Sequence, residues 1–108
     1  MFPSLPGRTA KPKVLLLYRQ YASSFTAYPW IFGRDGKIEV HTLAPGSHAI
    51  RHSRWVDAHH TFDEPGGMIA ALLDLLEKGG YAAMLCIDEP ARELVLENRS
   101  NPLIKPYL

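Results

Sequence analysis

Four short segments of the chain carry the apolar patterns of strands. Residues 13–18 (KVLLLY) and 81–87 (YAAMLCI) are continuous apolar runs, which are typical of strands covered on both faces in a parallel sheet. Residues 37–43 (KIEVHTL) alternate apolar with polar positions, and residues 56–62 (VDAHHTF) form a weaker segment of similar length. The pattern therefore predicts four strands at these positions.

Helical spacing occupies the segments between the strands. The clearest helix follows Asp63-Glu64-Pro65: its apolar residues form one wide stripe, and Gly79-Gly80 ends it because glycine accepts the left-handed conformation. A second helix is predicted over residues 91–98, after the similar junction Asp88-Glu89-Pro90.

Three other segments give weaker signals. Residues 21–33 have helical spacing that Pro29 should kink, and residues 47–54 fit a short helical turn capped by Ser47. Residues 103–108 follow Asn101-Pro102 and are predicted to be extended.

Strands that alternate with helices define the expected fold class. The order predicts an α/β fold: a Rossmann-like three-layer domain with a mainly parallel four-stranded sheet and helices on both faces. Residues 1–12 are rich in proline and predict a flexible leader, which leaves residues 13–108 as a single domain.

Composition indicates the class of protein but does not indicate a binding partner. Apolar residues make up 46% and charged residues 21% of the 108 residues, which is ordinary globular composition. The net charge is +1, with +6 in residues 1–54 and −5 in residues 55–108, and we interpret the two halves as parts of one domain whose fields largely cancel. Basic residues are not clustered as nucleic-acid binding requires, and no apolar run approaches the ~18 residues of a membrane span. The lone Cys86 excludes an internal disulfide and predicts a reducing, cytoplasmic setting.

Most common catalytic motifs are absent from the sequence. It contains no GxGxxG, GxxxxGK[ST], GxSxG, HExxH or CxxC motif, so no catalytic residue is assigned. Five histidines raise the question of a metal site. His48 and His52 share a face only on a helix, and the adjacent His59 and His60 point to opposite faces of a strand, so at most one of that pair can join. We therefore predict no metal site and interpret the histidines as solvated surface residues.

Candidate binding residues follow from the position of ligands in open parallel sheets, which is beyond the carboxyl ends of the strands. These positions hold Arg19, Gln20, Tyr21 and Ser23 after the first strand, and Asp88 and Glu89 after the fourth. Each has a structural alternative: Ser23 caps a helix, and Asp88 caps the next helix or pairs with Arg19. Gly66 and Gly67 form a second candidate, an anion site made by open N–H groups at the start of a helix.

Three stretches of the chain resemble a known family. The opening strand KVLLLY, the passage SRWVDAHHTFDEP and the stretch LLDLLEKGGYAAMLCIDEPAR are similar to the N-terminal, pre-ATP-grasp domain of ATP-grasp ligases, a group that includes carbamoyl-phosphate synthase, biotin carboxylase and D-alanine–D-alanine ligase. The resemblance covers residues 13–98.

The resemblance implies a substrate-side domain that packs against a following ATP-grasp domain. Arg19, Gln20, Tyr21, Asp88 and Glu89 match the positions where contacts to a small-molecule acceptor substrate would fall. ATP and Mg²⁺ would bind the following domain, so this chain needs no cofactor of its own and is expected to be inactive alone, as a truncated piece of a ligase or a stand-alone relic.

An alternative needs no second domain. The chain is then a stand-alone Rossmann-like module that binds a small ligand or self-associates, with residues 21–32 and 103–108 as the interface of a homodimer.

Overall fold

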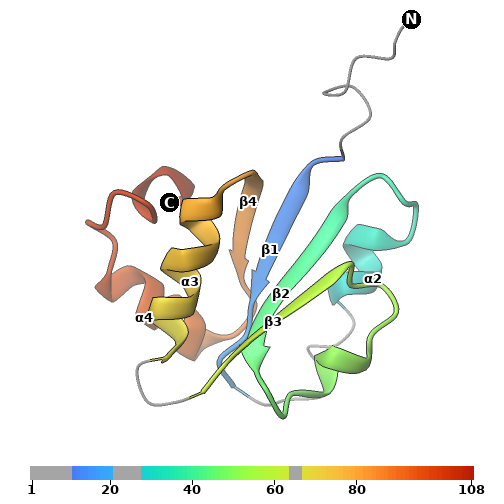
Figure 1. Cartoon of the computed structure of the whole chain (residues 1–108), viewed down its shortest axis with the longest axis horizontal. Coiled ribbons are helices and arrows are strands. Elements are labelled where there is room, and N and C mark those ends of the chain that lie inside the picture. The colour runs from blue at the N-terminus through green and yellow to red at the C-terminus, as the bar shows by residue number, and fades with distance from the viewer. Residues whose placement is uncertain (1–10, 21–27, 64–66) are drawn as a thin grey trace, which may run out of the picture.

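A four-stranded parallel sheet forms the centre of the molecule. The computed structural model describes residues 11–20, 28–63 and 67–108 (Figure 1). The strands are β1 (Lys13–Leu17), β2 (Glu39–Pro45), β3 (Ala58–Phe62) and β4 (Tyr81–Cys86). All neighbours run parallel, in the order β3-β2-β1-β4. This confirms the predicted α/β fold and its parallel four-stranded sheet.

Helices cover both faces of the sheet, as the three-layer prediction requires. On one side lie α3 (Gly67–Lys78) and α4 (Glu89–Glu97), and on the other lie α2 (Tyr28–Gly33) and the 3-10 turn η2 (Ala49–His52) (Figure 1). Because side chains alternate along a strand, Leu15 and Leu17 of β1 face α3 and α4, while Leu16 faces the side of α2. All three leucines are fully buried.

The α3 helix shows how the sequence pattern becomes packing. Met68, Leu72, Leu75 and Leu76 are its buried residues and share the face turned to the sheet. The helix ends at Gly79 and Gly80, whose φ angles of 77° and 91° suit glycine alone.

The prediction of an extended segment over residues 103–108 was wrong. Turns and a 3-10 helix, η3 (Lys105–Tyr107), fold this segment back onto the core, where Ile104 is fully buried. The turn forms because the Asn101 side chain accepts a hydrogen bond of 2.9 Å from the N–H of Leu103. Tyr107 then donates its hydroxyl to the carbonyl of Tyr81, 3.1 Å away.

Other differences are shifts of element boundaries. The strands predicted at residues 37 and 56 begin at Glu39 and Ala58. The turn predicted over 47–54 is η2, whose cap is His48 and not Ser47. Within the described residues α2 starts at Tyr28, so Pro29 lies in the first helical turn, where its missing N–H costs no hydrogen bond; residues 21–27 lie outside the description.

Truncation of Leu72 tests the packing of α3 on the sheet. Leu72→Ala is expected to lower the free energy of unfolding by about 2–5 kcal/mol, because the side chain is fully buried and its loss leaves a cavity. Urea denaturation measures the change. As a control, Leu96→Ala on α4 removes a leucine that is 36% exposed and should cost less than about 1 kcal/mol. A loss at Leu72 no larger than that of the control would show that this stripe is not core.

Candidate functional site

Two polar groups lie at opposite ends of the sheet, and the first is at the carboxyl ends of β1 and β4. The chain extends the sheet in one direction from β1 through β2 to β3, and then places β4 on the other side of β1. The ends of β1 and β4 are therefore the point at which the strand order reverses, which is where open α/β sheets bind ligands. We call this region the β1–β4 rim, formed by Arg19, Gln20, Asp88 and Glu89.

Asp88 is the central residue of the rim and is 4% exposed. Its Oδ2 accepts hydrogen bonds from the backbone N–H groups of Arg19 and Gln20, each at 2.8 Å. Its Oδ1 accepts from the N–H of Ala91 at 2.9 Å and so caps α4. One carboxylate thus joins the end of β1 to the start of α4. The contact with Arg19 that the sequence suggested runs through its backbone N–H.

Two other rim residues are exposed to solvent. Gln20 and Glu89 are exposed, and the Glu89 carboxylate pairs with the Arg92 guanidinium at 2.5 Å, one helical turn away. The structure brings Arg19, Gln20, Asp88 and Glu89 to one corner, as expected from the sequence.

The remaining candidates lie elsewhere. Tyr21, Ser23 and Gly66 fall outside the described residues. Gly67 is the first residue of α3 and lies near Phe62, at the end of β3. Since β3 is at the opposite edge of the sheet from β4, Gly67 is not part of the rim.

A buried aromatic pair lies behind the rim. Tyr18 and His48 are both fully buried, with ring centroids 5.0 Å apart, and His48 Nδ1 accepts a hydrogen bond of 3.0 Å from the N–H of Ile50. Burial raises the pKa of Tyr18 well above its usual range and lowers the pKa of His48, so both side chains are neutral at physiological pH. The expectation that the histidines are solvated was wrong for His48, and also for His41, which is 9% exposed.

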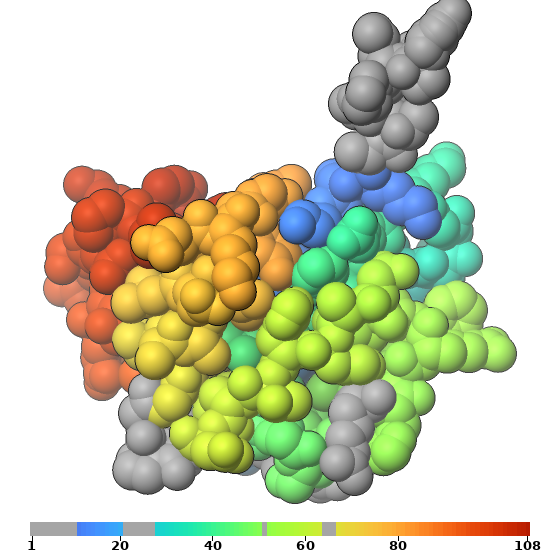
Figure 2. Space-filling model, in the orientation of Figure 1, coloured from blue at the N-terminus to red at the C-terminus, as the bar shows by residue number. Residues whose placement is uncertain are grey.

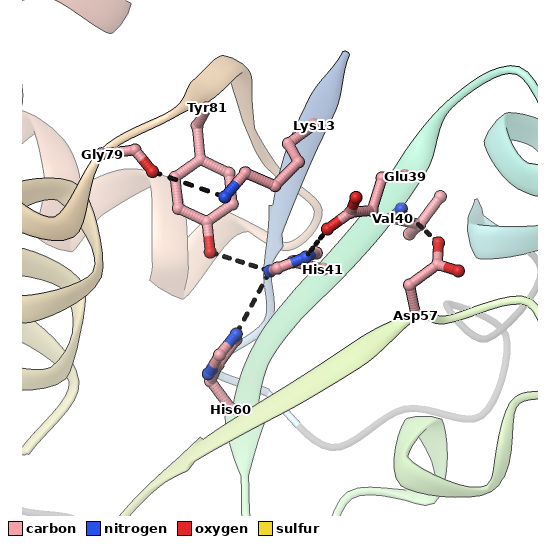
Figure 3. A network of polar contacts seen from close by, with 8 residues as sticks. All are labelled: Lys13, Glu39, Val40, His41, Asp57, His60, Gly79 and Tyr81. Atoms are coloured by element: carbon pink, nitrogen blue, oxygen red, sulfur yellow. Dashed lines mark hydrogen bonds and ion pairs between the residues drawn. The ribbon is translucent and has the colours of Figure 1, made fainter. Parts of the chain in front are cut away.

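The second polar group lies towards the amino ends of the strands, on the face that carries α3. It consists of Lys13, Glu39, His41, His60 and Tyr81, which come from all four strands, and we call it the histidine network (Figure 3). On the face seen in Figure 2, the start of β1 lies between β2 and the turn that joins α3 to β4. The network reaches the surface through Glu39, whose side chain is 39% exposed.

His41 is the hub of the network. Its Nε2 lies 2.6 Å from Oε2 of Glu39, while its Nδ1 lies 2.9 Å from the Tyr81 hydroxyl and 3.3 Å from Nε2 of His60. A carboxylate only accepts hydrogen bonds, so Nε2 carries a proton and donates a hydrogen bond to Glu39. In a neutral ring Nδ1 is then an acceptor, and the Tyr81 hydroxyl donates to it.

The surroundings hold Tyr81 and His60 neutral. Burial, followed by the charge of Glu39, raises the pKa of Tyr81, so the phenol keeps its proton. Burial, with nearby positive charge, lowers the pKa of His60. Lys13 lies with Nζ 4.9 Å from the centre of the Tyr81 ring and donates a long hydrogen bond of 3.5 Å to the carbonyl of Gly79.

A second contact fixes the strand that carries Glu39 and His41. The Asp57 carboxylate accepts a hydrogen bond of 2.8 Å from the N–H of Val40, between these two residues (Figure 3). This contact holds the backbone that carries the network at the amino end of β2.

Some of the side-chain orientations in this network could be predicted from the sequence. Opposite orientations of His59 and His60 are confirmed: His59 Nδ1 contacts the Thr42 hydroxyl at 3.0 Å on the far face, while His60 reaches His41. The spacing of Glu39 and His41 also places them on one face of a strand. The contact with Tyr81 depends on the sheet order, because its side chain crosses β1 to reach His41 on β2.

Comparisons with known proteins give no relative. No protein-family model, no curated protein and no solved structure matches this chain. Within the ranges that the structure describes, no helix has the length and apolar character needed to cross a membrane. In the same ranges, no three His, Cys, Asp or Glu side chains are grouped so as to hold a metal ion among themselves.

The joining role of Asp88 is tested by removing one of its two acceptor oxygens. Asp88→Asn is expected to lower the free energy of unfolding by about 1–3 kcal/mol, because at least one buried N–H group loses its charged acceptor. Chemical denaturation of both proteins gives the difference. Glu93→Gln, at an exposed position of the same helix, should change stability by less than about 0.5 kcal/mol. Equal effects of the two substitutions would contradict the assigned role.

Proposed function

We propose that the chain is a Rossmann-like domain that binds a small polar molecule at the β1–β4 rim. The observation that carries the proposal is the strand order β3-β2-β1-β4 in an all-parallel sheet, which reverses between β1 and β4. Ligands of open α/β sheets bind beyond the carboxyl ends of the strands at such a reversal. The histidine network lies towards the other end of the strands and has no part in this proposal.

The chemistry of the rim favours a ligand that carries an amine or hydroxyl group. The Asp88 carboxylate already occupies the positive end of the α4 dipole and accepts the N–H groups that would otherwise hold an anion. The exposed acceptors of the rim include the Gln20 amide and the Glu89 carboxylate, one oxygen of which pairs with Arg92, and such oxygens suit amines and hydroxyls.

A more specific role for the same domain is the substrate-side part of an ATP-grasp ligase. Its support is the resemblance of residues 13–98, together with a sheet that has the parallel α/β character the resemblance implies. In this role the acceptor substrate contacts the rim, and a following ATP-grasp domain supplies ATP and Mg²⁺. The chain alone then has no ligase activity.

One titration series tests both levels of the proposal. The ¹⁵N-labelled chain is titrated with free amino acids and α-hydroxy acids, and separately with ATP and Mg²⁺, while backbone amide shifts are followed. We expect at least one of the small acids to shift the amides of residues 19, 20 and 88–92, and ATP with Mg²⁺ to bind negligibly at up to millimolar concentration.

Variants make this result specific. Gln20→Ala and Glu89→Ala should weaken binding of the small acid at least threefold, whereas Glu97→Ala, exposed at the far end of α4, should not change it. Shifts that cluster away from the rim would overturn the binding proposal. Micromolar binding of ATP would contradict the substrate-side role. The rim proposal would then be decided by the titration with small acids alone.

Self-association is a second candidate function, favoured by the surface of α2. Tyr28, Trp30 and Ile31 are 38%, 43% and 50% exposed, an unusual density of large apolar groups on six residues. The tail predicted as the other half of the interface folds onto the core, although Leu108 is 60% exposed.

Light scattering distinguishes a homodimer from a monomer. We expect the molar mass to rise from 12.1 kDa towards twice that value with concentration, and Ile31→Asp to abolish the rise by placing a charge in the apolar contact. Tyr28→Phe retains the apolar ring and serves as the control. A wild-type chain that stays monomeric at millimolar concentration would exclude this function.

A further inference from the structure

We infer that His41 and His60 form a binding site for one divalent transition-metal ion of the zinc or copper type. The site lies in the histidine network, apart from the rim, and is independent of the proposed function. Its two nitrogens, Nδ1 of His41 and Nε2 of His60, come from neighbouring strands and face each other at 3.3 Å (Figure 3).

The spacing of these nitrogens suits two ligands of one ion. Nitrogens that each lie about 2.0–2.1 Å from a tetrahedral zinc ion are about 3.3–3.4 Å apart, with ring centroids about 5.2 Å apart when both rings point at the metal. The ring centroids of His41 and His60 are 5.3 Å apart. The two rings are therefore already placed for chelation.

Glu39 orients the first ligand as carboxylates do around metal centres. Its Oε2 holds the Nε2 proton of His41 at 2.6 Å, which leaves the lone pair of Nδ1 directed at the proposed site. Without a metal, this lone pair faces two neighbours, the Tyr81 hydroxyl at 2.9 Å and Nε2 of His60 at 3.3 Å. An ion would use the lone pairs of both histidines and leave Tyr81 free to donate to a metal-bound water.

The donor set decides which ions fit. Two imidazoles suit Cu²⁺, Zn²⁺ and Ni²⁺, and do not suit Mg²⁺ or Ca²⁺, which prefer oxygen ligands. No third His, Cys, Asp or Glu completes the set among the described residues. Water or a small ligand would therefore fill the other two positions of a tetrahedral ion, one more than in open zinc sites, which have three protein ligands. The positive charge of Lys13 lies close to Tyr81 and opposes binding, while Glu39 offsets it.

Calorimetric titration of the full chain with Zn²⁺ at pH 7.5 tests the inference. We expect one equivalent to bind, and His41→Gln and His60→Gln each to weaken the affinity at least tenfold. The matched control is His59→Gln: this histidine is adjacent in sequence but contacts Thr42 on the other face of the sheet, so its loss should leave the affinity unchanged. Glu39→Gln should weaken binding about tenfold through the orientation of His41. Mg²⁺ should not bind.

A second readout does not depend on the stability of the variants. In the wild-type chain, Zn²⁺ should shift the imidazole ¹⁵N resonances of His41 Nδ1 and His60 Nε2, and leave those of His59 in place. The inference is overturned if Zn²⁺ does not bind at millimolar concentration or if these two resonances do not move. It is also overturned if His60→Gln binds as tightly as the wild type, or if His59→Gln loses as much affinity as His60→Gln.

Discussion

The burial of β1 on both faces is the constraint on which the other features depend. Leu15, Leu16 and Leu17 are fully enclosed, so the strand must have a neighbour on each side and helices above and below. A central strand held in this way fixes the position of both its ends. Its carboxyl end then meets β4 at the rim, and its amino end carries Lys13 into the histidine network.

The rim and the histidine network differ in how completely their polar atoms are paired by hydrogen bonds. At the rim, both oxygens of Asp88 are engaged with backbone N–H groups, so this residue stabilises the fold, and the proposed contacts to a ligand fall to Gln20 and Glu89. In the histidine network, two potential donors compete for one nitrogen of His41. Because only one of these donors can use the lone pair fully, a bound ligand could change the hydrogen bonding of this group of titratable side chains.

The sequence allowed the strands and the two long helices to be predicted, because continuous apolar runs and the stripe of α3 depend only on local periodicity. The Asp88 cap was also accessible, since an acid before proline at a strand–helix junction is a local signal. The histidine network was not, because the contact of His41 with Tyr81 requires knowledge of which strand lies between them. The fold of residues 103–108 was not predicted because Pro102 was interpreted only as the end of a helix. In the structure the Asn101 side chain accepts a hydrogen bond from Leu103 and so forms a turn at this point.

The cap at Asp88 also limits how this protein can change. The Asp88 carboxylate contacts Arg19, which is 69 residues away in the sequence, and also the start of its own helix, so the connection between β4 and α4 has no spare length. Adding or deleting one residue there would carry the acid away from its partners even if the acid itself were retained. Homologous chains should therefore tolerate insertions in the turn after β2 more readily than in this short connection.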